Sequence, residues 1–231
     1  MMDTFFKDLF SLLYVTFIYE DRWKFFLEGF GMTLLLTLSA FILGSLFGAL
    51  LCALKLSRRR WIRKISSVFV SLLVQLPTLV LLMIFVYIIF GSVPLSVVVI
   101  VIMGLTLKAG SYLADIFYSA VTSVEKGEIE AAHTLGMSKF QTFRYITLPQ
   151  AVSSALPIYK NQFIITLQET AIVGYLAIVD LTRASDIVSA RTLNAMFGLL
   201  VISVLYLLIG WAGNSLLSLL GHQKHLGGEV Q

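Results

Sequence analysis

Long apolar runs separated by short polar segments limit what this chain can fold into more than any other feature. The chain is 58% hydrophobic and only 13% charged, whereas soluble domains carry about 45–50% apolar and about 25% charged residues. The excess lies in runs long enough to cross the ~30 Å hydrocarbon core of a bilayer as helices. The sequence therefore predicts an all-α polytopic membrane protein with five transmembrane helices, over residues 25–54, 66–90, 95–123, 153–179 and 193–220.

The segments outside these runs complete the predicted organisation. Residues 1–24 mix aromatic and charged side chains, which indicates an amphipathic external segment at the membrane interface, with a short extra span over 9–19 as the alternative. The other parts are a transmembrane domain (25–220), its polar insert (124–152), a charged loop (180–191) and a cytoplasmic tail (221–231).

Basic side chains set the predicted orientation of the spans. Because cytoplasmic loops carry the excess of Lys and Arg, the loop between the first two spans is predicted to face the cytoplasm. Alternation then places the insert and the C-terminus in the cytoplasm and the N-terminus outside. The net charge of +4 follows from this bias and indicates no nucleic-acid partner. The basic residues of that loop are Lys55, Arg58, Arg59, Arg60, Arg63 and Lys64.

The polar insert at 124–152 is predicted to form two short helices joined by a turn. Gly136 can adopt the left-handed conformation that ends a helix, and Ser138 can cap the next one. Leu148-Pro149 is predicted to stop that second helix before the fourth span. A chain needs no such insert to cross a bilayer, so we expect a cytoplasmic protein to bind it.

The spacing of residues inside the insert is specific. It follows the pattern E-A-A, three residues, G, nine residues, I, one residue, L-P, which resembles the EAA loop of ABC importer permeases. The resemblance implies that the first helix docks into a groove on an ATP-binding subunit and transmits its motion. The alternative is an ordinary cytoplasmic loop with an alanine-rich helix. The matching residues are Glu130, Ala131, Ala132, Gly136, Ile146, Leu148 and Pro149.

Further motifs, spread over roughly residues 28–220, resemble those of the polar amino acid subfamily of these permeases. They are Gly31-Met32-Thr33-Leu34 with Thr37, Leu105-Thr106-Leu107, Tyr112-Leu113-Ala114-Asp115, and Leu148-Pro149-Gln150-Ala151 with Leu156-Pro157. The chain departs from the subfamily at Val74-Gln75-Leu76-Pro77 (usually R-G-T-P), at Gln168 (usually Lys) and at Lys108 (usually uncharged). These departures concern the identity of the solute more than the transport role.

The resemblance implies a type I ABC importer permease in a bacterial plasma membrane that translocates a polar amino acid or a similar small polar solute. It also implies a second permease, identical or homologous, two ATP-binding subunits and an extracytoplasmic solute-binding protein. This chain would bind no cofactor, because ATP and Mg would lie on the partner subunits.

Charged and amide side chains inside the predicted spans are candidates for the substrate pathway. Intramembrane charge is costly and tends to mark pathways or paired groups. Lys108 and Glu169 lie at similar predicted depths, so they line a cavity that meets a charged substrate, form a structural ion pair, or do both. Asp115 is predicted to be a gate or interface residue. The full set of candidates is Lys108, Glu169, Gln168, Asn161, Gln75 and Asp115.

Two features predict how the spans pack. Gly44 and Gly48 form a small-xxx-small pair that permits close helix contact. Pro77 and Pro157 are expected to bend their spans. We therefore expect one close helix crossing and two irregular spans.

The alternative function is that of an ion-driven secondary transporter, in which Lys108, Glu169 and Asp115 form a proton relay. The EAA pattern and the lack of an inverted repeat argue against it. No phosphate-binding loop, nucleophile elbow or metal-binding triplet occurs in the sequence. The sequence therefore predicts a transport subunit, not an enzyme.

Overall fold

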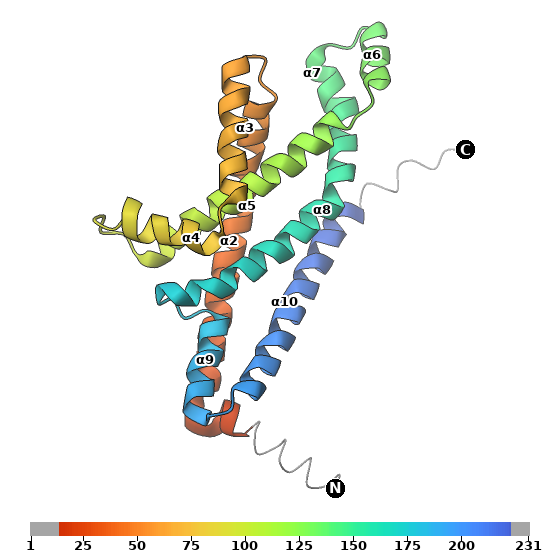
Figure 1. Ribbon diagram of the computed structural model, residues 1–231. Helices are drawn as coiled ribbons and strands as arrows, with labels where there is room; N and C mark the ends of the chain where they lie inside the picture. Colours follow the sequence, from red (N-terminus) through yellow and green to blue (C-terminus); the bar gives the residue numbers. More distant parts are fainter. Residues whose placement is uncertain (1–13, 223–231) are drawn as a thin grey trace.

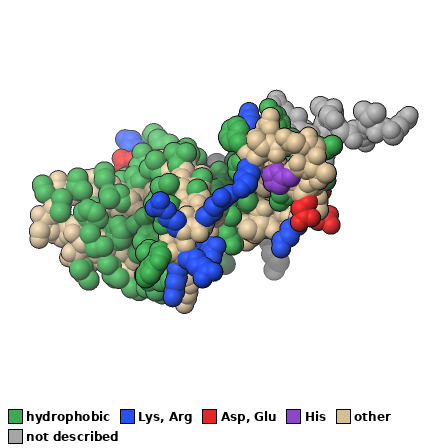
Figure 2. Space-filling model, turned by 90° about the horizontal axis from the view of Figure 1, so that it is seen from above, with side chains coloured by type: hydrophobic (Ala, Val, Ile, Leu, Met, Phe, Trp, Pro, Cys, Tyr) green, Lys and Arg blue, Asp and Glu red, His purple; other side chains and the backbone are tan. Residues whose placement is uncertain are grey.

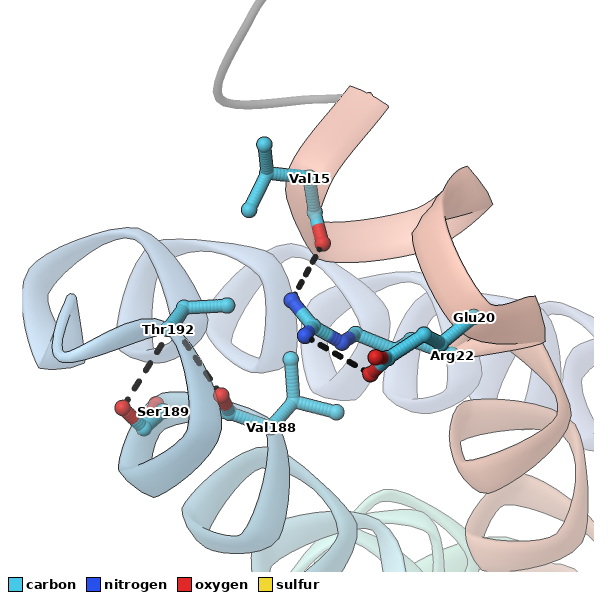
Figure 3. Close-up of polar contacts among 6 residues, drawn as sticks. All are labelled: Val15, Glu20, Arg22, Val188, Ser189 and Thr192. Carbon is cyan, nitrogen blue, oxygen red and sulfur yellow. Dashed lines mark hydrogen bonds and ion pairs between the residues drawn. The ribbon is translucent and has the colours of Figure 1, made fainter.

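The computed structural model describes residues 14–222, and every regular element in this part of the chain is helical (Figure 1). Most of the predicted N-terminal segment and almost all of the tail lie outside the described residues. Short turns η1 (Tyr14–Ile18) and η2 (Tyr19–Asp21) precede the first long helix. The buried Arg22 guanidinium donates hydrogen bonds to the Val15 carbonyl (2.8 Å) and to Glu20 (3.0 Å), which fixes these turns in place (Figure 3).

Three helices are long and apolar enough to cross a membrane unbroken. They correspond to the predicted first, third and fifth spans, whose predicted ends lie within about two residues of those in the structure. These helices are α2 (Trp23–Lys55), α5 (Val97–Thr122) and α10 (Ala195–His222).

The predicted second span is a broken helix. α3 (Arg60–Gln75) ends at Gln75, and α4 (Thr78–Met83), which continues into η3 (Ile84–Ile89), leaves the break at 107° to it. Pro77 explains the break, because it has no N–H to donate and pushes the preceding residue into an extended conformation. The bend expected at Pro77 is confirmed, and it is sharp enough to divide the predicted span into two helices.

The second helix of the insert runs directly into the fourth span. Residues Lys139–Leu176 are one helical stretch, made of α7 (Lys139–Thr142), η4 (Phe143–Thr147), α8 (Leu148–Glu169) and η5 (Thr170–Leu176). The prediction that Leu148-Pro149 stops the helix was wrong. Pro149 is the second residue of α8, where a missing N–H costs no α-helical hydrogen bond.

The predicted charged loop at 180–191 is also a helix, α9 (Leu181–Thr192). Asp180 caps it by accepting hydrogen bonds from the backbone N–H groups of Thr182 (3.1 Å) and Arg183 (3.0 Å). Three apolar residues at helical spacing, Leu181, Ala184 and Val188, are fully buried. The loop prediction was wrong because it weighed the charges and missed this cap and this buried stripe.

The glycines of α2 bring it close to α5, as the small-xxx-small pair predicted. A Cβ atom on Gly48 would lie 2.8 Å from the carbonyl oxygen of Gly110, and one on Gly44 would lie 3.1 Å from the Ala109 Cβ. Such contacts leave no room for a larger side chain at Gly48, so this crossing depends on glycine.

We therefore expect Gly48→Val to separate α2 from α5 and to destabilise the fold by about 1–3 kcal/mol, the usual cost of overpacking. The measurement is the midpoint of thermal unfolding in detergent. Gly31→Val is the matched control, because Gly31 lies on the same helix and a Cβ there would meet nothing within 4 Å. An equal change of the midpoint in both variants would contradict the packing explanation.

Candidate functional site

The helix ends inside the insert follow the local sequence as predicted. α6 (Lys126–Thr134) is terminated two residues after its end by Gly136, whose φ of 81° only glycine adopts readily. The N–H of Met137 reaches back to the Ala132 carbonyl (3.1 Å), the pattern of a Schellman motif. Ser138 then accepts a hydrogen bond from the Gln141 N–H (3.3 Å), while its own N–H donates to the Gln141 side chain (2.8 Å).

The residues of the EAA pattern divide into an outer and an inner group. Glu130, Ala131 and Gly136 are exposed, whereas Ala132 is buried and the later residues of the pattern are half-buried. The insert projects from one end of the molecule, the same end at which α3 starts (Figure 1). Large apolar side chains on a polar, projecting element indicate a surface that binds another protein. On this insert they are Leu135, 83% exposed, Phe140, 73% exposed, and Tyr145, 64% exposed.

A side-chain contact ties the insert to the membrane domain. The amide of Gln150, at the start of α8, donates to the carboxylate of Glu128 on α6. Sequence reasoning missed this pair, because its members lie on opposite sides of the turn and nothing in their spacing indicates that the turn folds back.

Lys108 is buried and caps the broken end of α3. Its ammonium group donates to the carbonyl oxygens of Leu73 (2.9 Å), Val74 (2.9 Å) and Leu76 (2.5 Å). The last carbonyls of a helix lack intrahelical partners and carry partial negative charge, so a cation stabilises them. An ammonium has three donors, and all of them are used within the chain. This favours the structural role for Lys108 over contact with a substrate.

Glu169 lies at the other side of the same break. Its carboxylate accepts a hydrogen bond from the hydroxyl of Thr78 (2.8 Å), the first residue of α4, where the helix dipole is positive. Lys108 and Glu169 thus lie on the two sides of one break, but among the described residues they form no ion pair with each other. Each charge stabilises one of the two helix ends created by Pro77.

Asp115 forms an ion pair with Lys55. The Lys55 ammonium also lies 4.7 Å from the centre of the Tyr118 ring. This contact joins the end of α2 to α5 on the insert side. Sequence reasoning used Lys55 only as an orientation signal and did not identify it as the partner of Asp115.

The three candidate amides lie on the surface of the single chain. Gln75 is exposed and donates to the Ser71 hydroxyl (2.7 Å). Asn161 and Gln168 are exposed on one face of α8, since seven residues make nearly two helical turns. Beside them Gln162 is buried, and its amide nitrogen lacks a hydrogen-bond partner within the described part of the chain. Polar groups in a span face protein or water, so this face of α8 is predicted to meet a partner subunit or an aqueous cavity.

Comparison with known proteins identifies the family. Residues 40–223 match the family described as the inner membrane component of binding-protein-dependent transport systems. A putative glutamine transport system permease protein, GlnP of Rickettsia prowazekii, is 32% identical over 187 residues, which cover 79% of this chain and 85% of GlnP. The L-cystine transport system permease protein TcyB of Bacillus subtilis is 30% identical over 206 residues, which cover 89% of this chain and 87% of TcyB.

A solved structure agrees with these relatives. The chain is similar, with a TM-score of 0.78 and 30% identity, to a chain in the crystal structure of an amino acid ABC transporter with histidines, covering 87% of this chain and 94% of that one. The predicted all-α fold of an importer permease is therefore confirmed, and the alternative of an ion-driven secondary transporter is set aside. This chain belongs to the family of inner membrane components of binding-protein-dependent transport systems: it is a multi-pass permease subunit of an ABC importer, not an enzyme.

Proposed function

We propose that this permease translocates a polar amino acid or a similar small polar solute. The names of its relatives, which refer to glutamine and cystine transport, support this class of solute. The observation that carries the coupling mechanism is the exposed insert, whose second helix continues without a break into α8. Motion of a subunit docked on the insert would therefore pass directly into the membrane domain.

The proposed assembly contains this chain, a second permease of identical or homologous sequence, two ATP-binding subunits and an extracytoplasmic solute-binding protein. ATP and Mg would be bound by the ATP-binding subunits. Binding of ATP would bring the two inserts together and open the cavity outward, and hydrolysis would reset it. Because α8 ends at Glu169, beside the break between α3 and α4, the movement would reach the residues around Pro77.

The transport proposal is tested by reconstituting the chain in vesicles with its partner permease, its ATP-binding subunit and its solute-binding protein. We expect ATP hydrolysis and uptake to rise together when the binding protein carries one polar amino acid, and an ionophore to leave uptake unchanged. Uptake that needs no ATP and stops when the ion gradient is dissipated would contradict the proposal.

The proposed orientation places the insert and the C-terminus in the cytoplasm and the N-terminus outside. Reporters fused after Arg60 and after Lys126 are expected to be cytoplasmic, and one fused after Asp186 external, because basic residues concentrate on the first side. The measurement pairs a reporter active only in the cytoplasm with one active only outside. A single fusion with the opposite result would overturn this topology.

A further inference from the structure

An apolar pocket of about 450 Å³ lies between α2, α5 and α8, on the side of the insert. Its size falls within the range of ligand pockets, about 300–1,000 Å³. The only polar side-chain groups among its lining residues are the Cys52 thiol and the Tyr159 hydroxyl, and that hydroxyl is already hydrogen-bonded to Ser45 (3.0 Å). The walls therefore offer a polar solute no free partner, and they suit a hydrocarbon chain.

The pocket lies on the side of α8 away from the exposed amides. At about 100° per residue, Asn161 and Gln168 are turned by about 180–200° from the pocket residue Tyr159. Val152, which lines the pocket, and Leu50, which follows the lining residue Ala49, are exposed apolar side chains. The pocket thus adjoins an apolar outer surface and is separated by α8 from the face where a substrate pathway is predicted.

Basic side chains border the pocket where it meets the insert side. Leu56 lines the pocket at the end of α2, and the exposed residues Arg58, Arg59 and Arg60 come two to four positions later in the chain. Across the pocket, the lining residue Phe143 is followed by the exposed Arg144. Figure 2, seen from the insert end, shows Lys and Arg side chains gathered in the middle of this face. Basic pockets between membrane helices bind anionic lipid head groups.

We propose that this pocket binds one acyl chain of an anionic phospholipid, whose phosphate lies against Arg58–Arg60 and Arg144. The lipid comes from the leaflet on the side of the insert. The apolar lining recognises the chain and the arginines recognise the charge, because guanidinium groups pair well with phosphate. This site goes beyond transport and does not rest on the proposed solute. The arginine border favours an anionic head group over an apolar helix of a second permease copy, because such a helix carries no negative charge to pair with it.

The first test compares phospholipids retained by the full-length chain in mild detergent, measured by native mass spectrometry. We expect phosphatidylglycerol to be retained about tenfold better than phosphatidylcholine with the same acyl chains, because basic side chains at the membrane surface attract anionic head groups. Ala155→Phe, which fills the pocket, is expected to abolish this preference. Val204→Phe is the control, because Val204 is 55% exposed on α10 and does not line the pocket.

The charge requirement is tested separately. Changing Arg58, Arg59 and Arg60 together to Gln is expected to remove the preference for phosphatidylglycerol. The matched control changes three exposed basic residues at the opposite end of the molecule, Lys24, Arg183 and Arg191, to Gln and is expected to keep it. Loss of the preference in both triple variants, or in neither, would overturn the proposal.

The unmodified chain offers a third test, because its single cysteine, Cys52, lines the pocket. Phosphatidylglycerol added to detergent micelles is expected to slow maleimide labelling of Cys52 severalfold, whereas phosphatidylcholine is expected to leave the rate unchanged. Equal rates with both lipids would overturn the proposal. So would protection that rises with protein concentration and ignores the lipid, since a second copy of the chain would then occupy the pocket.

Discussion

Glu130→Lys is expected to abolish uptake while leaving the permease folded in the membrane. Glu130 is exposed on α6, and its side chain forms no ion pair within the described residues, so its loss costs the isolated chain little. At a docked interface, by contrast, reversing a charge that becomes buried typically costs about 2–5 kcal/mol or more. The measurements are solute uptake and co-purification of the ATP-binding subunit.

Glu125→Lys is the control for this experiment. Glu125 is also exposed, lies immediately before α6 and stands outside the EAA pattern. Normal uptake in the Glu130 variant, or an equal loss in both variants, would show that α6 is not the coupling element.

The turn after α6 provides an independent version of the same test. A residue other than glycine at Gly136 is strained by about 1–2 kcal/mol because φ is positive there. No clash contributes, since an added Cβ meets nothing within 4 Å. Gly136→Val is thus expected to impair uptake strongly, and Gly136→Asn mildly, because asparagine tolerates this conformation. Gly127→Val is the control, with equally open space and no positive φ.

Lys108→Met is expected to prevent stable folding or assembly. It leaves three carbonyl oxygens at the end of α3 without their donor, and a buried polar group left unsatisfied costs about 1–3 kcal/mol. Combining it with Glu169→Gln is expected to restore neither stability nor uptake, because the carbonyls remain without a donor. Glu169→Gln alone is expected to be mild, since its amide oxygen still accepts from Thr78.

Thermal unfolding in detergent and uptake, measured on both single variants and the double variant, distinguish these outcomes. Full recovery in the double variant would mean that Lys108 and Glu169 neutralise each other in the assembled transporter. A fully stable Lys108→Met variant that fails only in uptake would instead point to substrate contact.

Local rules explain what the sequence predicted well. Gly136 and Ser138 act through neighbours within a few residues, and their conformations followed from their chemistry alone. The length of the apolar runs was enough to predict the positions of α2, α5 and α10. The partners of Lys108 were beyond such rules, because they are backbone oxygens 32 to 35 residues away that become available only after Pro77 breaks the span.

Composition gave the wrong local structure at two places, where a helix cap or the position of a residue within a helix was decisive. The charges of 180–191 indicated a loop. However, the Asp180 carboxylate accepts hydrogen bonds from two backbone N–H groups and thereby caps the start of a helix. Pro149 indicated a stop, yet it stands in the first turn of α8, where proline is tolerated. In both places the residue type was identified correctly, and its position relative to the helix start decided its effect.

The π-helical turn Phe143–Thr147 sets the rotational register between the insert and the transmembrane part of α8. A π turn is what one additional residue leaves in an α-helix, and each residue added to a helix turns everything beyond it by about 100°. Insertion or deletion of one residue between Gln150 and Gln168 would therefore point the exposed face of α6 in a new direction relative to Glu169. The same change before α6, between Ser123 and Glu125, would leave the connection from α6 to α8 intact, so tolerance to length variation should differ sharply between these two segments.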